Sequence, residues 1–245
     1  MKKRLLSAIL SFCMLLTMAP TVAFAAEDDE AANTISLADA TETSGTSTTI
    51  EDIYHNKWTV TTAENCITME QGDNKITATL DNAMLTVAGT GAMPVLNDST
   101  DAVSGSQLQA YPWAGWKDSV KKIVISDGVT SIGSKAFIAY TNVTSVSIGK
   151  NVSSIGVGAL SQLSACTTFN VSSENSYFMT DTTGALFDHS KTKLIAFPCG
   201  SSVEEYAIPA TVKVISYGAF SRAAHLKTIT IPADSSLSTI GYGAF

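Results

Sequence analysis

A short signature, Ile-Gly-x-x-Ala-Phe, recurs with small variations through the second half of the chain and restricts the fold more than any other feature. Four stretches carry it: 129–137, 152–160, 212–220 and 237–245. Short apolar triplets precede the signatures and begin at positions 123, 146, 169, 206 and 229, so their separations are 23, 23, 37 and 23 residues. A fixed period with extra length at one place is typical of a solenoid built from stacked repeats.

Each triplet predicts a strand, and the stacked strands predict a parallel β-sheet. Because side chains alternate along a strand, the outer two residues of each triplet enter the core and the middle one faces outward. The outward residues are Val124, Ser147, Asn170, Ala207 and Thr230. We therefore expect a β-rich solenoid of about five rungs over residues 121–245, with a single helical turn at each signature. Gly133, Gly156 and Gly241 are expected to allow a sharp turn, although Ser216 stands at the same position in one copy.

The long 37-residue unit predicts an insertion at 172–203. Its alternating segments, joined by a polar stretch at 188–192, predict a β-hairpin that projects from the solenoid or extends it. The last signature ends at Phe245 without the polar cap that a solenoid end requires. We expect that either the chain is part of a longer protein or a neighbour covers this face.

The first 50 residues predict targeting and spacing rather than a folded core. Lys2, Lys3 and Arg4 precede an apolar stretch, and an Ala-x-Ala site ends at Ala25, which is typical of a secretory signal peptide over residues 1–25. Residues 26–50 are rich in Ser, Thr and acidic side chains and predict a disordered spacer. Signal removal would change the net charge from −7 to −10. An acidic chain of this kind disfavours nucleic acid and anionic membranes as partners.

Residues 51–120 predict a small β-rich segment that caps the solenoid. Polar and apolar residues alternate near Trp58 and over 75–80, which indicates a hairpin or meander. Three large aromatic residues, Tyr111, Trp113 and Trp116, follow a polar loop at 97–109. They fit either a hydrophobic lid over the core or a platform on which a carbohydrate stacks.

No pattern in the sequence predicts catalysis, a cofactor or a metal site. The mature chain would retain Cys66, Cys166 and Cys199, an odd number without Cys-x-x-Cys spacing. We expect buried thiols that behave as small apolar residues, with a Cys166–Cys199 bridge as the alternative. His189 and His225 fall in a predicted turn and just before a strand, where solvated side chains are expected.

The repeated signature and the Ile229-Thr-Ile231-Pro232 ending resemble the BspA-like leucine-rich repeats of secreted bacterial surface proteins. The insertion, with segments 175–177, 184–187 and 194–198, resembles a frequent variant unit of that family, and the elements at 80–93 and 112–113 resemble the segment that precedes its first repeat. The resemblance covers about residues 58–245 and implies a leucine-rich-repeat solenoid. It also implies adhesion, binding of host matrix proteins or co-aggregation.

Three functions fit the sequence. The first is a secreted, non-catalytic protein that binds an extracellular protein or glycan and is associated with the cell surface. The second is the binding or spacer part of a secreted hydrolase whose catalytic domain lies beyond Phe245. The third is a structural role with end-to-end contact through the last rung. The candidate ligand surface comprises Val124, Ser147, Asn170, Thr230, Tyr111, Trp113 and Trp116.

Overall fold

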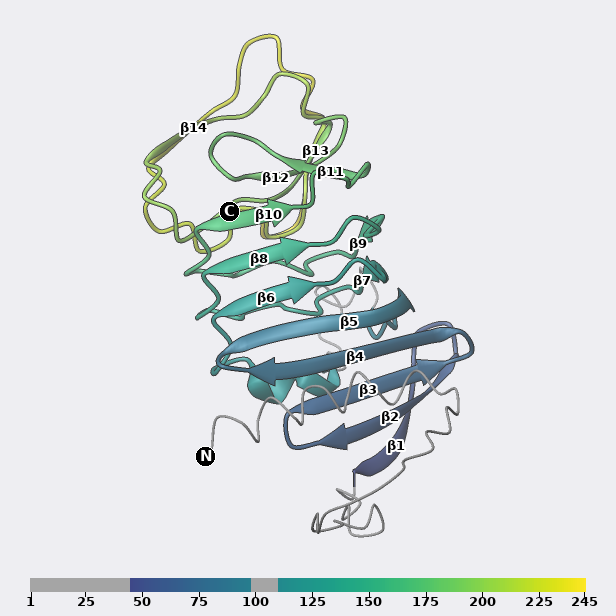
Figure 1. Ribbon diagram of the computed structural model, residues 1–245. Coiled ribbons are helices and arrows are strands. Elements are labelled where there is room, and N and C mark those ends of the chain that lie inside the picture. Colours follow the sequence, from purple (N-terminus) through teal and green to yellow (C-terminus); the bar gives the residue numbers. More distant parts are fainter. Residues whose placement is uncertain (1–44, 98–109) are drawn as a thin grey trace, which may run out of the picture. The chain divides into compact units, whose positions relative to one another are not determined.

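Short parallel strands stacked one above another make up the C-terminal part of the chain (Figure 1). The computed structural model describes residues 45–97 and 110–245. The predicted signal peptide, most of the predicted spacer and nearly all of the predicted polar loop at 97–109 lie outside the described residues.

An antiparallel meander precedes the solenoid, as the alternating pattern predicts. Its strands are β1 (Thr46–Glu51), β2 (Lys57–Ala63), β3 (Cys66–Gln71), β4 (Asn74–Asp81) and β5 (Met84–Ala92). The inward residues of β2 to β5 are buried, while their outward neighbours are more exposed. The last strand, β5, pairs in parallel with the first solenoid strand, with Leu85 opposite Ile123. The meander therefore continues the solenoid sheet and covers one end of it.

Strand β1 shows that the predicted spacer does not extend to residue 50. It pairs with β2 along its whole length, and Ile50 lies opposite Trp58. The prediction of disorder was wrong here because it considered only the scarcity of large apolar residues. Four of the six residues of β1 are Thr or Ile, which favour strands, and backbone pairing with β2 holds them in place.

Each rung of the solenoid contributes a face strand and then a side strand. We number the rungs 1 to 5 in chain order. The face strands are β6 (Lys122–Ile125), β8 (Ser145–Ile148), β10 (Thr168–Val171), β14 (Glu205–Ala207) and β16 (Thr228–Thr230). The side strands are β7 (Val129–Ile132), β9 (Ser154–Ile155), β13 (Lys193–Ala196), β15 (Val214–Ile215) and β17 (Thr239–Ile240).

The triplets fall in register, and their predicted orientation is confirmed. In rungs 1 to 3 the triplets pair residue for residue, so that Ile123, Val146 and Phe169 lie side by side in the core. The middle residues of these triplets are half-buried or exposed. Rung 5 departs from the pattern, because Ile229 is only half-buried and Ile231 is 49% exposed.

The insertion interrupts both stacks of strands between rungs 2 and 4. It forms the predicted hairpin from β12 (Leu186–Asp188) and β13, with one more strand, β11 (Phe178–Thr180), on its outer edge. Within the described residues β10 does not pair with β14, and β9 does not pair with β13. The sheet order becomes β11-β12-β13-β15-β17, so the insertion extends the solenoid rather than projecting from it.

The signatures form tight turns rather than the predicted single helical turns. Ala136 N–H donates to Gly133 O at 3.2 Å in rung 1, and Ala159 N–H donates to Gly156 O at 3.1 Å in rung 2, so each bond closes a turn. The fourth signature position then has positive φ, +59° at Lys135 and +65° at Gly158. This left-handed conformation cannot continue a right-handed helix. Among the described residues the only helical element is the 3-10 helix η2 (Pro112–Trp116).

The glycine that follows the signature isoleucine serves close packing, which corrects the predicted role in turning. The positive φ lies two residues further on, whereas Gly156 lies where the backbone of the preceding rung comes close. A Cβ on Gly156 would be 2.7 Å from Ser134 Cα and 2.8 Å from the Gly133 carbonyl carbon. A Cβ on Gly241 would likewise be 2.7 Å from the Ser216 carbonyl carbon. Glycine is needed because no side chain fits between the stacked turns.

Candidate binding surfaces

Three of the predicted ligand-contacting residues lie side by side on the solenoid face. Val124, Ser147 and Asn170 are the middle residues of β6, β8 and β10 and lie directly opposite one another in the parallel sheet. They line a shallow hollow of about 440 Å³, which Asp127 borders. We call this surface the ladder face. Thr230 lies instead on the separate β14–β16 sheet, so the predicted row of outward residues is divided in two.

The aromatic residues Tyr111 and Trp113 are buried, so the prediction of a carbohydrate-stacking platform was wrong for them. They are 3% and 0% exposed, and their rings stack at 5.1 Å. Tyr111 Oη donates to Pro94 O at 2.6 Å and Trp113 Nε1 donates to Ala136 O at 3.3 Å, so their polar atoms are satisfied internally. Trp116 is half-buried and packs against the same core.

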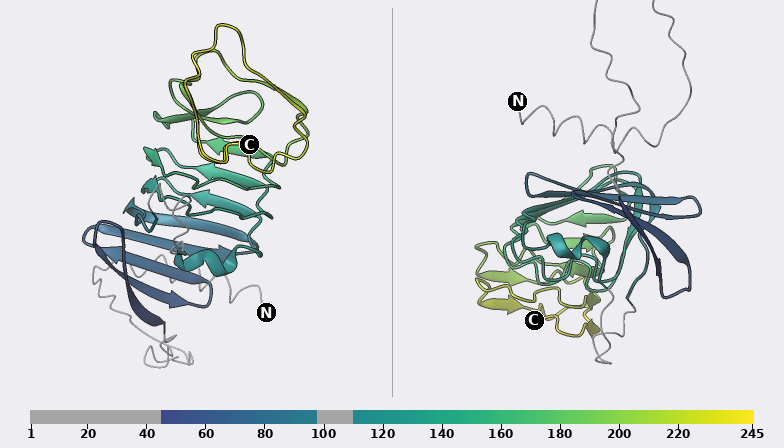
Figure 2. Two further views of the ribbon diagram at one scale, coloured as in Figure 1. Left: turned by 180° about the vertical axis from the view of Figure 1, so that it is seen from behind. Right: turned by 90° about the horizontal axis from the view of Figure 1, so that it is seen from below.

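These aromatic residues form the alternative that the sequence left open, a hydrophobic lid. Trp113 also stacks on Phe137 of rung 1, with ring centroids 6.1 Å apart. In the view from below in Figure 2, η2 lies within the outline of the stacked rungs and covers the end of their core. Burial of Tyr111 raises the pKa of its hydroxyl, as expected for a side chain removed from water. Within this lid, Tyr111 and Trp113 stabilise the fold and offer no ring face to a ligand.

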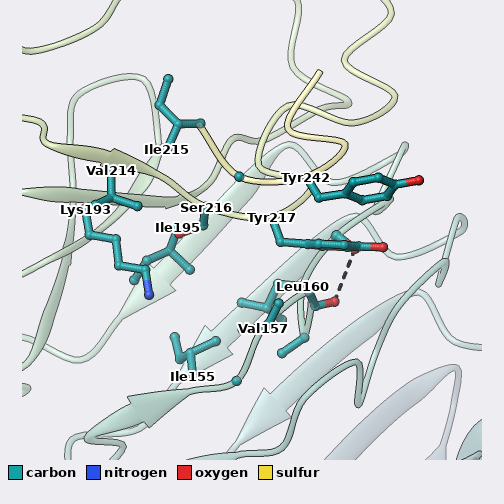
Figure 3. Close-up of a pocket in the computed structure, with 15 residues that line it drawn as sticks. Ile155, Val157, Leu160, Lys193, Ile195, Val214, Ile215, Ser216, Tyr217 and Tyr242 are labelled. Carbon is teal, nitrogen blue, oxygen red and sulfur yellow. Dashed lines mark hydrogen bonds between the residues drawn. The ribbon is translucent and has the colours of Figure 1, made fainter. Parts of the chain in front are cut away.

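A second surface, a groove on the side of the solenoid, was not predicted from the sequence. One wall is the turn of rung 2 from Ile155 to Ser161, and the other is formed by Val214 to Tyr217 of rung 4. Lys193 and Ile195 of the inserted strand β13 also line it (Figure 3). We call this space, of about 300 Å³, the side groove.

The side groove exists because rung 3 lacks the signature turn. Where the other rungs have Ile-Gly-x-x-Ala-Phe or a close variant, rung 3 continues from Leu194 to Phe197 and then Pro198. Proline lacks a backbone N–H and restricts the preceding residue to extended conformations, so the usual turn cannot form there. Rung 4 therefore faces rung 2 directly, and Tyr217 packs over Gly158.

Ser216 stands where the other signatures have glycine, and the missing turn explains why a side chain fits. Its Oγ is buried and has no hydrogen-bond partner. Ser161 Oγ, on the opposite wall, donates to Gly158 O at 3.2 Å. The sequence shows that Ser216 replaces the signature glycine. It does not show why serine fits there, because that depends on the absence of a turn in the preceding rung.

Charge and aromatic side chains border the side groove. Lys193 is exposed, and no carboxylate of the described residues lies within 4.0 Å of its ammonium group. Tyr217 and Tyr242 stack with centroids 5.8 Å apart and an interplanar angle of 25° (Figure 3). Burial, and secondarily the neighbouring Tyr242, raises the pKa of Tyr217. Tyrosine at the same signature position in two successive signatures was the sequence signal for this stack.

The described cysteines Cys166 and Cys199 lie in the core rather than at a functional site. Cys166 and Cys199 are buried free thiols, so the alternative of a bridge between them is not supported. Within residues 45–97 and 110–245 no three His, Cys, Asp or Glu side chains are grouped so that they could hold a metal ion. In the same part of the chain, no helix is both long and apolar enough to cross a membrane.

Rung 5 exposes large apolar side chains. Ile240 is 52% exposed, and Tyr242 and Phe245 are 64% and 61% exposed. The prediction of an end-to-end contact through this rung stays a prediction.

Comparison with solved structures finds two leucine-rich proteins and one vaccine antigen, all of them bacterial. A leucine-rich repeat protein from Eubacterium ventriosum is 23% identical over 69% of this chain, with a TM-score of 0.37. The pneumococcal vaccine antigen PcpA is 17% identical over 73% of this chain and 67% of its own, with a TM-score of 0.42. A leucine-rich cell surface protein from Faecalibacterium prausnitzii is 16% identical, covers 73% of both chains and has a TM-score of 0.32.

The family assignment rests on the repeats and not on these distant structures. The chain spans 60% of the length of the Eubacterium protein. No curated protein matches the sequence significantly. Six copies of the BspA type leucine rich repeat region match residues 108–198 and 190–245, which together cover more than half of the sequence and all five rungs. The chain therefore belongs to the family of proteins with BspA-type leucine-rich repeats.

Proposed function

We propose that this chain is a secreted, non-catalytic binding protein that contacts an extracellular protein or glycan through the ladder face. The observation that carries the proposal is the alignment of Val124, Ser147 and Asn170 on three neighbouring strands around one hollow. These side chains are small or polar, and none of them is needed in the core. A row of such residues on a rigid sheet can make many weak contacts with a broad ligand.

The family supports the same reading. Proteins with BspA-type repeats are typically bacterial surface or secreted proteins and are generally non-catalytic. The amino-terminal residues 1–25 have the composition of a secretory signal peptide, which supports export. The net charge of −10 that the chain would have after signal removal favours ligands that are neutral or basic where they meet the ladder face.

Binding of the purified chain to arrays of matrix proteins and glycans tests the proposal. The variant Ser147→Arg places a long side chain in the centre of the hollow and should abolish binding of any ligand that the array identifies. Thr59→Arg is a matched control, because Thr59 is exposed on β2 of the same sheet, far along the strand order from the ladder face. Absence of any array ligand, or equal binding by both variants, would contradict the proposal.

A further inference from the structure

The hollow of the ladder face presents polar groups that the fold does not fully use. Asp127 Oδ1 accepts Lys150 N–H at 2.9 Å, whereas its Oδ2 has no partner among the described residues. Asn170 Oδ1 accepts the Thr168 hydroxyl at 3.4 Å, so its Nδ2 group is available to donate. Ser147, on the middle strand, forms no side-chain hydrogen bond within the same residues, and its hydroxyl can donate or accept. The hollow therefore offers donors and acceptors together.

The outward row of the ladder face continues beyond the hollow onto the meander. Val124 lies opposite Thr86 of β5, and Thr86 lies opposite Thr79 of β4. With Ser147 and Asn170 they form one row across five neighbouring strands (Figure 1). At a strand spacing of about 4.8 Å, the row is about 19 Å long. A ligand that follows it crosses from the third rung to the meander.

The hydroxyl groups of this row have no part in holding the rungs together. At the start of the face strands, by contrast, hydroxyls bind the preceding rung: Thr144 Oγ1 donates to Lys121 O at 3.0 Å, and Thr167 Oγ1 donates to Thr144 O at 3.2 Å. Thr79 and Thr86 are half-buried, and in residues 45–97 and 110–245 their side chains form no hydrogen bond. They remain available to a ligand at the surface.

The composition of the row favours a glycan over a protein. Binding hot spots between proteins are enriched in Trp, Tyr and Arg, whereas Ser, Thr and Val are under-represented. The row contains two Thr, one Val, one Ser and one Asn, and it has no charged or aromatic side chain. Asp127 is the only charged residue in the described lining of the hollow, and its carboxylate would repel an acidic sugar. A neutral glycan has hydroxyl groups that match both the donors and the acceptors.

We propose that the ladder face binds a neutral, linear glycan that lies across the strands along this row. This assignment rests on the proposed function of the face and names the class of its ligand. Asp127 and Asn170 bind hydroxyl groups of a sugar in the hollow, and Thr86 and Thr79 bind sugars further along the same glycan. Because no aromatic ring in the row stacks on a sugar, binding depends on hydrogen bonds that each contribute little. A glycan must therefore span several strands to bind well.

Isothermal titration calorimetry with neutral oligosaccharides tests this dependence on length. The probes are cello-, malto-, xylo- and chito-oligosaccharides, each from the disaccharide to the octasaccharide. For at least one series, the affinity should rise with length and become constant once the oligosaccharide spans the row. Oligogalacturonides of the same lengths serve as acidic probes and should bind more weakly.

Two variants separate the row from the hollow. Thr79→Arg obstructs the far end of the row, so long oligosaccharides should bind it no better than short ones, while short ones keep their affinity. Thr86→Val retains the shape of the side chain but removes the hydroxyl group, and it should weaken binding of long oligosaccharides about fivefold. Thr59→Arg, the control of the array experiment, should leave every affinity unchanged. Circular dichroism and thermal unfolding establish that the variants fold.

The possible failures are distinguishable. If the arrays identify only protein ligands, and Ser147→Arg abolishes their binding, the ladder face is a binding site but the glycan assignment is wrong. Affinities that do not depend on length, or that Thr79→Arg and Thr59→Arg affect equally, would contradict the role of the row. Stronger binding of oligogalacturonides would contradict the neutral ligand. Absence of any ligand on the arrays would overturn the proposed function and the glycan assignment together.

Discussion

Replacement of Gly156 by alanine should destabilise the solenoid because the new methyl group meets backbone that cannot rotate away. The added Cβ would lie 2.7 Å from Ser134 Cα and 2.8 Å from the Gly133 carbonyl carbon. Forcing an extra carbon into close-packed structure costs about 1–3 kcal/mol and sometimes more, and contact with fixed backbone places Gly156→Ala at the upper end. Loss of glycine flexibility in the unfolded chain offsets about 0.5 kcal/mol. We expect a net loss of about 2.5 kcal/mol, which lowers the melting temperature by roughly 5–10 °C.

Urea and thermal unfolding, followed by tryptophan fluorescence, measure this loss. Two controls separate contact from other effects of the methyl group. Ser216→Ala changes the same signature position in rung 4, where a Cβ is already accommodated, and should be neutral or stabilising because it removes a buried hydroxyl without a partner. Gly72→Ala should cost about 1 kcal/mol, because Gly72 has a φ of +56° but nothing within 4 Å of an added Cβ. Equal stability of Gly156→Ala and Ser216→Ala would refute the close-packing argument.

Three further predictions concern the lid, the titration of one carboxyl group and the thiols. Trp113→Ala should lower the free energy of unfolding by about 3–5 kcal/mol in urea, and a loss below 1 kcal/mol would contradict the role of the lid. Burial alone would raise the pKa of Asp52, but hydrogen bonds from neighbouring side chains and backbone outweigh it and hold the pKa below its ordinary 3.8. The resulting stabilisation is present above pH 3.8 and lost as the pH falls below it, so Asp52→Asn should flatten the acid limb of the stability profile, and an unchanged limb would exclude this origin. Burial raises the pKa of Cys166 and Cys199 to about 12, so iodoacetamide at pH 8 should label these two thiols only after unfolding, as peptide mapping would show; rapid labelling of the native chain would contradict their burial.

The repeat period alone predicted the solenoid and the orientation of its triplets. Strand alternation requires that residues two apart share a face, so the outward position of Ser147 and Asn170 followed from the spacing. The hairpin within the insertion followed in the same way from alternation on both sides of the polar stretch at 188–192. Local patterns of this kind are informative because each depends only on neighbouring residues in the chain.

Features that depend on contacts between rungs could not be predicted. Gly156 was assigned to a sharp turn, whereas its surroundings are set by the backbone one rung earlier. The burial of Trp113 depends on Phe137 and Ala136, which lie more than 20 residues away in the sequence. To predict the side groove one must know which rung faces which after the insertion, and only the structure supplies that.

Amide hydrogen exchange of the unliganded chain tests most directly whether the solenoid is interrupted after rung 2. The measurement compares Gly158 and Leu160 with their counterparts Lys135 and Phe137 by nuclear magnetic resonance at neutral pH. The missing turn predicts that the two amides of rung 2, for which residues 45–97 and 110–245 provide no acceptor, exchange much faster than the paired amides of rung 1. Equal protection of all four amides would show that rung 2 is paired like rung 1, and it would contradict both the interruption and the groove.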